Sequence, residues 1–264
     1  MKRALALILA LTAGTALAGS ANQLYLIKPD GKAAPLARIV SGGFESLSLG
    51  DDETGMPPRS LHVYLGARHA GKVKVGAAAI PDGTGCGDAE SLALAPLAGS
   101  EVPASGLATS LPLNLRPARP EIAVTPADLR ALSQLASAWM EKHGVKRKDR
   151  LAALKTLEAG DAGQVVAASI NYDNIDANQM VTLFFLAEKG VGGQFSLVYE
   201  DSYVGPHGEA EKANKKYLEH LDLDADGVDE VVISGSAYES WFYSILKRQG
   251  GKWVEVHSQD GGGC

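Results

Sequence analysis

The sequence predicts an α+β fold that consists mainly of antiparallel β-sheet, with one covering helix and a small β-rich region before it. Three observations indicate this class. Short apolar segments separated by glycine, proline and aspartate turns occur in both halves of the chain. One segment repeats its apolar residues at helical spacing. A set of three strand-like segments occurs twice in the second half, so we expect one antiparallel sheet built from two three-stranded repeat units.

Residues 1–18 have the features of a secretory signal peptide. Lys2 and Arg3 precede an apolar stretch, and the triplet Ala16-Leu17-Ala18 suits cleavage by signal peptidase. The stretch is shorter than the roughly 18 residues that a membrane-spanning helix needs, and no later apolar run reaches that length. We therefore expect a periplasmic or secreted protein without a membrane span.

The composition is that of a globular protein with an excess of negative charge. The 264 residues are 45% hydrophobic and 21% charged, with a formal net charge of -6. Removal of the signal peptide would take away two cations and make the chain more acidic still. Because a surplus of negative charge is unfavourable beside phosphate groups, we expect no nucleic-acid partner.

The region from residue 19 to residue 95 is expected to form a small β unit. Its strand-like segments are LYLI at 24, ARIV at 37, SLHVYLG at 60 and KVKVGAAAI at 72. Residues 96–126 follow, and this stretch contains six of the twelve prolines. A segment so rich in proline is expected to be a linker or an extended arm.

Residues 127–264 are expected to form an α+β repeat domain that begins with a helix. Thr125 is a suitable N-cap, Pro126 suits the first helical position, and Gly144 ends the helical pattern. A second, shorter helix is expected over residues 151–157. The apolar face of the first helix consists of Leu129, Leu132, Leu135, Ala136 and Trp139.

The two repeat units align over three segments each. QVVAASINYD at 164 matches EVVISGSAYE at 230, VTLFFLAEK at 181 matches SWFYSILKR at 240, and GGQFSLVY at 192 matches GGKWVEVH at 250. Twelve of the sixteen aromatic residues lie between Tyr172 and Trp253, so we expect the main core in this half.

The segment LDLDADGVDEVV, residues 221–232, concentrates negative charge and predicts a calcium site. Carboxylates this close would repel one another unless a cation neutralised them. Alternate residues of a tight loop turn inward, and Gly227 permits the sharp turn. All the available donors are hard oxygens, which favours Ca²⁺ over softer metals. The expected ligands are the side chains of Asp222, Asp224, Asp226 and Glu230 and the carbonyl of Val228.

This segment does not fit an EF-hand, because the twelfth position counted from Asp222 is Ile233 and not Glu. It resembles the D-x-D-x-D-G-x-x-D/E calcium loop of FG-GAP and VCBS repeat proteins, in which the loop leads directly into a strand. The resemblance covers one motif within residues 220–264. It implies a β context and the ligands Asp222, Asp224, Asp226 and Glu230. A solvated acidic turn without an ion is the alternative.

Two cysteines occur, Cys86 and Cys264. Export to an oxidising compartment favours a disulfide between them, and the alternative is a pair of free or intermolecular thiols.

These features together predict a non-enzymatic, calcium-stabilised binding or structural module of the cell envelope, with a protein or glycan partner. The aromatic residues Tyr238, Trp241, Tyr243 and Trp253 are either core residues or a platform on which a sugar stacks.

The alternative function is a secreted hydrolase or an enzyme inhibitor. Its site would be assembled from residues that are distant in the sequence, such as His62, His207 and Asp201.

Overall fold

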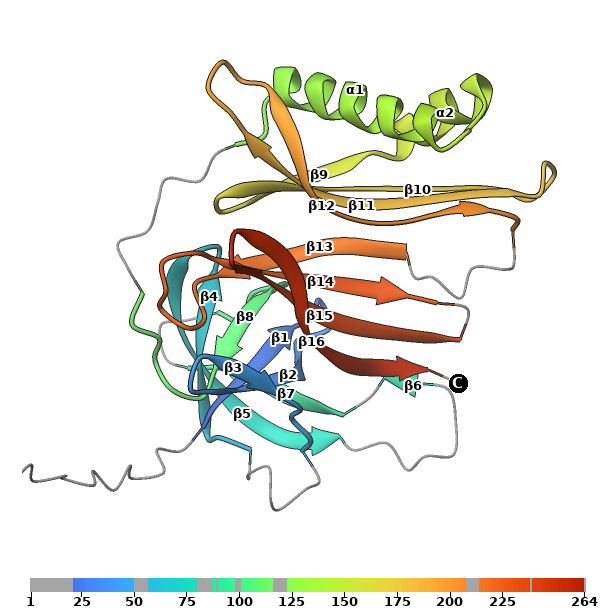
Figure 1. The fold of residues 1–264 in the computed structure, drawn as a ribbon. Helices are drawn as coiled ribbons and strands as arrows, with labels where there is room; N and C mark the ends of the chain where they lie inside the picture. Colours follow the sequence, from blue (N-terminus) through green and yellow to red (C-terminus); the bar gives the residue numbers. More distant parts are fainter. Residues whose placement is uncertain are drawn as a thin grey trace, which may run out of the picture.

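The fold is a stack of layers, with helices at one end and a β-barrel at the other (Figure 1). The predicted signal peptide and both cysteines lie outside the residues that the structure describes. Within the described part, neither helix has the length and apolar character that a membrane crossing requires. The structure is a computed structural model, and it describes residues 21–49, 57–79, 87–88, 90–97, 101–115, 123–207, 214–237 and 239–263.

The N-terminal strands form a closed barrel. They are β1 (Asn22–Ile27), β2 (Lys32–Val40), β3 (Gly43–Glu45), β4 (Ser60–Leu65), β5 (Arg68–Ala79), β7 (Ser91–Pro96) and β8 (Gly106–Thr109). β1 bonds to both β8 and β2, so the order β1-β8-β4-β5-β7-β2 returns to its start, and β3 extends from β2. Alternate side chains fill the interior, among them Tyr25, Ile27, Leu61 and Leu92. Most strands of the expected β-rich region therefore form a barrel with its own core, and the barrel also includes β8 from beyond residue 95.

Strand β8 comes from the proline-rich segment that the sequence predicts to be a linker or arm. It lies between β1 and β4, and both Leu107 and Ala108 are buried. The linker prediction is therefore wrong for residues 106–109. The physical reason is that the stretch between Pro103 and Pro112 has no proline, so its backbone can donate to both neighbouring strands.

A second sheet, here called the helix-side sheet, lies under the helices. It contains β9 (Glu158–Ala162), β10 (Val165–Asn174), β11 (Gln179–Lys189) and β12 (Phe195–Gly205), all antiparallel. Helix α1 (Pro126–Lys142) covers one face and is followed by α2 (Arg147–Ala153) and a 3₁₀ turn, η1 (Leu154–Thr156).

The start of α1 agrees with the sequence prediction. Thr125 is the N-cap, its side chain accepts from the N–H of Asp128, and Pro126 lies in the first turn. The second helix begins at Arg147, four residues before the predicted start. Its N-cap, Lys146, makes no side-chain cap, so no local signal marked this boundary.

A third sheet, the central sheet, lies between the helix-side sheet and the barrel (Figure 1). Its order is β13 (Asn214–Leu221), β14 (Glu230–Ser236), β15 (Ser240–Gln249), β16 (Lys252–Gly263) and, at the edge, β6 (Gly87–Asp88). The pairing of β6 with β16 joins Gly87 to Gly263 and Asp88 to Gly262. These pairs stand next to Cys86 and Cys264 in the sequence, and the disulfide between the two cysteines stays a prediction.

The prediction of one sheet is wrong, because the two proposed repeat units lie in two sheets packed face to face. The reason is visible in β10 and β11, whose apolar residues are continuous and not alternating. Val166 and Phe185 face the helices, whereas Val165 and Phe184 face the central sheet. A sheet with two apolar faces needs a cover on each side. The repeat itself stays a prediction.

Candidate metal centre

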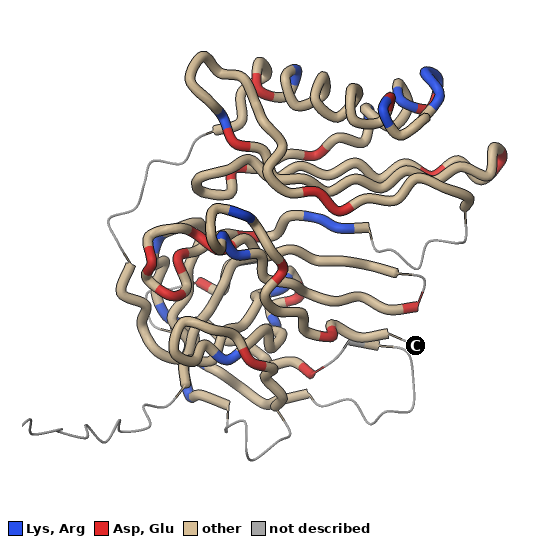
Figure 2. The backbone as a smooth tube through the Cα atoms, in the orientation of Figure 1, with Lys and Arg blue, Asp and Glu red and all other residues tan. Residues whose placement is uncertain are grey.

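The acidic loop, residues 222–230, connects β13 to β14 (Figure 2). β13 ends at Leu221, and Glu230 is the first residue of β14. Two residues in the loop have positive φ, Ala225 at 63° and Gly227 at 92°. A left-handed conformation suits glycine and is uncommon for alanine, so the loop turns sharply at both positions. Gly227 thus has the role that the sequence predicts.

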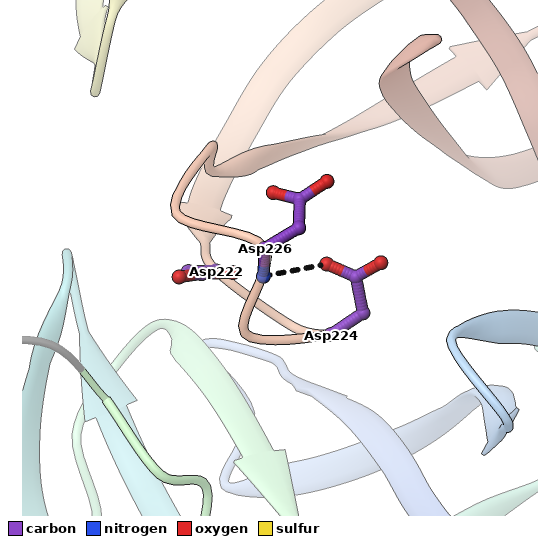
Figure 3. A group of neighbouring side chains, drawn as sticks. All are labelled: Asp222, Asp224 and Asp226. Carbon is purple, nitrogen blue, oxygen red and sulfur yellow. Dashed lines mark hydrogen bonds between the residues drawn. The ribbon is translucent and has the colours of Figure 1, made fainter.

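The loop brings the three alternating aspartates together. One carboxylate oxygen from each of Asp222, Asp224 and Asp226 lies within 4.8 Å of the others (Figure 3). Asp222 is buried, Asp224 is half-buried and Asp226 is exposed, so the cluster extends from the interior to the surface. This group could hold a metal ion.

Each aspartate also orders the loop with one of its oxygens. Asp222 Oδ2 accepts from the N–H of Gly227 at 3.0 Å, and Asp224 Oδ1 accepts from the N–H of Asp226 at 3.3 Å. Asp226 Oδ1 accepts from the N–H of Val228 at 2.8 Å. Side chains that bond to their own loop hold the carboxylates in place before any ion binds.

The inner aspartate has an unsatisfied oxygen. Asp222 is 8% exposed, and its Oδ1 is buried without a hydrogen-bond partner in the part of the chain that the structure describes. Burial raises the pKa of Asp222, and the charges of Asp226 and Asp224 add to that rise, although the Gly227 N–H opposes it. A buried charged oxygen without a partner is unfavourable unless a cation satisfies it.

Lys247 of β15 is a cation beside the cluster that the sequence analysis missed. Its Nζ contacts Asp224 Oδ2, and it lies 3.5 Å from Asp226 Oδ2 and 3.3 Å from Glu230 Oε1. Burial alone would lower the pKa of Lys247, but the hydrogen bond to Asp224 and the charge of Glu230 raise it above its ordinary value. The strand register could have indicated this residue, because Val231 pairs with Leu246.

Glu230 belongs to the same group through shared partners. It is 1% exposed, and its Oε2 accepts from the N–H of Leu223 at 2.8 Å. Burial raises the pKa of Glu230 to about 7, with a further contribution from Asp224, while the Leu223 N–H and Lys247 act in the opposite direction. The carbonyl of Val228 stays a predicted ligand.

Turns from the other two layers lie against the acidic loop. Gln164, between β9 and β10, donates to the carbonyl of Gly227 at 3.3 Å and accepts from the N–H of Asp229 at 3.0 Å. On the barrel side, a Cβ added to Gly42 would lie 3.6 Å from Asp224 Oδ2. The loop therefore sits where the barrel, the central sheet and the helix-side sheet meet.

Comparisons of the chain with family models, curated proteins and solved structures find no match. The similarity to FG-GAP and VCBS repeat proteins consequently rests on the loop motif alone.

The residues considered for an enzymatic site have separate partners. His62 Nδ1 lies 3.3 Å from His69 Nε2, His207 Nδ1 lies 2.8 Å from Asp173, and Asp201 pairs with Lys215 at 3.0 Å. Within the described ranges, no hydrogen bond or ion pair joins His62, His207 and Asp201 to one another.

A different histidine lies beside a cavity. The hydroxyl of Tyr217 is 2.7 Å from His220 Nδ1, and His220 Nε2 is 3.9 Å from Asp229 Oδ2. Both Tyr217 and His220 line a cavity of about 510 Å³. Sequence reasoning missed this pair, because neither residue stands in a recognisable motif.

The aromatic residues of the central sheet divide between two faces. Trp253 is 5% exposed and packs between the two sheets, so it is a core residue. Trp241 and Tyr243 face the barrel instead. Tyr238 lies outside the described residues.

Proposed function

We propose that this protein is an exported, non-enzymatic binding module of the cell envelope whose fold is stabilised by calcium. The observation that carries the proposal is the cluster of Asp222, Asp224 and Asp226, together with the buried Oδ1 of Asp222 that has no partner among the described residues. An acidic loop that only needed solvation would leave its carboxylates at the surface.

Calcium is the cation that suits these donors. It accepts six to eight oxygen ligands at flexible angles, and it binds carboxylates and backbone carbonyls together. The ligands would be Asp222, Asp224, Asp226, Glu230 and the carbonyl of Val228. Lys247, which contacts three of these carboxylates, would turn away when the ion binds. The spacing is that of the FG-GAP and VCBS loop, which supports the same choice.

The position of the loop supports a structural role for the ion. An ion held by the acidic loop would fix the connection between β13 and β14 and, through Gln164 and Asp224, its contacts with the other two layers. A catalytic metal keeps a coordination position open for water or substrate, whereas these five groups, with Glu230 binding through both of its oxygens, would fill six of the six to eight positions with protein oxygens. Exported modules bind calcium at roughly 0.1 to 1 mM, which suits the expected periplasmic or secreted location.

The test compares thermal unfolding of the purified chain in calcium and in chelator. At a calcium concentration of about 100 times Kd, binding adds about 2.7 kcal/mol to the stability. For a chain of this size that corresponds to a rise in Tm of about 5 to 11 °C. The double substitution Asp224→Ala with Asp226→Ala should abolish the rise.

The matched control changes two exposed acids outside the loop, Asp176→Ala with Glu200→Ala, and removes the same charge. This variant should keep the full calcium response. Identical melting curves for the wild-type chain in calcium and in chelator would reject the proposal.

A second candidate function, a secreted hydrolase or an enzyme inhibitor, is favoured only by the Tyr217 and His220 pair beside its cavity. Turnover of an ester or glycoside substrate that His220→Ala abolishes, with unchanged melting, would replace the first proposal by a hydrolase. Inhibition of a hydrolase that the same substitution removes would replace it by an inhibitor.

A further inference from the structure

A cavity of about 370 Å³ lies between the central sheet and the barrel, away from the acidic loop. Its floor is one face of the central sheet, where side chains form two rows across the strands. Its opposite wall comes from the end of β1 and the start of β8. The first row is Asn214, Ser236 and Trp241, and the second is Lys216, Ser234 and Tyr243.

The cavity offers mostly apolar surface. Trp241 and Tyr243 stand on the same face of β15, because side chains two residues apart in a strand point the same way. Leu26 of the barrel and Leu218 of β13 line the cavity with them. Most small-molecule sites combine such a lining with a few polar groups that orient the ligand.

A glycine explains how Trp241 is accommodated on this face. A Cβ added to Gly261 of β16 would lie 2.5 Å from Trp241 Cδ1, closer than side-chain contacts allow. The glycine run at the end of β16 therefore makes room for the indole ring. The absence of a side chain at Gly261 thus allows the half-buried Trp241 to lie at the cavity.

The charges of the lining are opposite to the charge of the protein. Lys28 and Lys216 line the cavity, and among the described residues no aspartate or glutamate does so. The whole chain has a net charge of -6. Lys216 Nζ pairs with Glu158 at 3.3 Å, and both side chains are more than half exposed, so this pair is weak and Lys216 can turn towards a ligand.

One polar atom of the lining residues lacks a partner. Within the described residues, Asn214 Oδ1 is buried and accepts no hydrogen bond. A buried acceptor that is left unpaired is unfavourable, and a hydroxyl or N–H group of a ligand would satisfy it.

We propose that this cavity binds a small amphiphilic anion. The aromatic or aliphatic body of the ligand lies between Trp241 and the barrel wall, its carboxylate or sulfonate group pairs with Lys28 and Lys216, and a hydrogen-bond donor reaches Asn214. This inference names the ligand class of the binding module proposed above and rests on that proposal. Strand β13 separates Asn214 from the acidic loop by about 23 Å, so a calcium ion there does not touch the ligand.

Calorimetric titration tests the proposal with naphthoate and decanoate as probes, and with naphthalenemethanol and decanol as their neutral counterparts. At least one anion should bind with one-to-one stoichiometry and a Kd below about 1 mM. Trp241→Ala should weaken that binding by about tenfold or more. Lys216→Gln should lower the affinity for the anion by about fivefold and change the affinity for the neutral counterpart by less than about twofold.

Two further variants keep the result interpretable. Ser234→Leu fills the floor of the cavity and should block binding while far-UV circular dichroism and melting stay normal. Lys252→Gln removes an exposed lysine of β16 that does not line the cavity, and it should bind as the wild-type chain does.

The proposal falls if neither anion binds at about 1 mM, if Ser234→Leu binds normally, or if Lys216→Gln affects both members of a pair equally. Repeating the titration in calcium and in chelator separates the two proposals. Anion binding by a chain that takes up no calcium would support the cavity and reject the calcium role. Calcium-dependent melting without anion binding would do the reverse.

Discussion

Replacing Lys247 by methionine tests whether the acidic loop is built for a cation. Methionine keeps the length and apolar stem of the side chain and removes its charge. The Nζ contacts Asp224, Asp226 and Glu230, and the lysine side chain is only 12% exposed. Removing one partner from a buried ion pair costs about 3 to 5 kcal/mol. In chelator, Lys247→Met should therefore lower the free energy of unfolding by about 3 kcal/mol and Tm by about 6 to 12 °C.

Lys247→Met lowers stability in chelator, but it should strengthen the binding of calcium. In the wild-type protein, calcium must displace the Lys247 ammonium group from the carboxylates that it contacts. The Lys247→Met protein has no ammonium group to displace. Calcium affinity should rise by about tenfold or more, equivalent to about 1.4 kcal/mol. The stability difference between the two proteins should shrink by a similar amount when calcium is added.

The assay is denaturant unfolding in calcium and in chelator, together with calorimetric titration of calcium. The matched control is Arg248→Met, because Arg248 is the next residue in β15 and pairs with Glu188 at 3.0 Å at the surface. It should change stability by less than about 1 kcal/mol in both conditions. Equal destabilisation by Lys247→Met with and without calcium, and no gain in affinity, would show that Lys247 is a structural partner of carboxylates that hold no ion.

Two other predictions concern Glu230 and the cysteines. Because the pKa of Glu230 is raised from 4.5 to about 7, the folded state without calcium binds its proton more tightly than the unfolded state. Stability in chelator should therefore fall by about 3 kcal/mol as pH rises between those values, relative to Glu230→Gln. Parallel pH curves for the two proteins would contradict this. A disulfide between Cys86 and Cys264 predicts that reduction adds two hydrogens to the intact mass and lowers stability by about 2 to 5 kcal/mol. A non-reduced chain that alkylates at both thiols would exclude the bond.

Features that depend on neighbouring residues could be predicted from the sequence. The N-cap at Thr125, the proline after it and the apolar face of α1 are all local signals, and the helix begins where they place it. The turn at Gly227 is local in the same sense. The strand-like segments that start at residues 60 and 72 predict the two strands of the first hairpin, because alternation and a glycine turn are local signals. The observed β5 begins at Arg68, four residues before the predicted start.

Features that depend on distant residues could not be predicted in this way. Closure of the barrel needs β1 to pair with both β2 and β8, and no local pattern encodes a second partner. The division into two sheets follows from the burial of both faces of β10 and β11. The apolar pattern alone does not show which element packs on each face. Lys247 joins the acidic loop because β15 pairs with β14, seventeen residues of chain away from Glu230.

The pairing of β6 with β16 has a consequence for how the protein reaches its native state. Gly87 and Gly263 are partners across most of the length of the chain, so this contact has a large loop-closure entropy to overcome. Contacts of such sequence separation form slowly, after local hairpins and helices. During synthesis the barrel can assemble early, while the last edge of the central sheet must wait until the final strand has emerged. Until β16 has formed, the edge of β15 is exposed. The nascent chain is therefore most able to pair with another molecule during this interval.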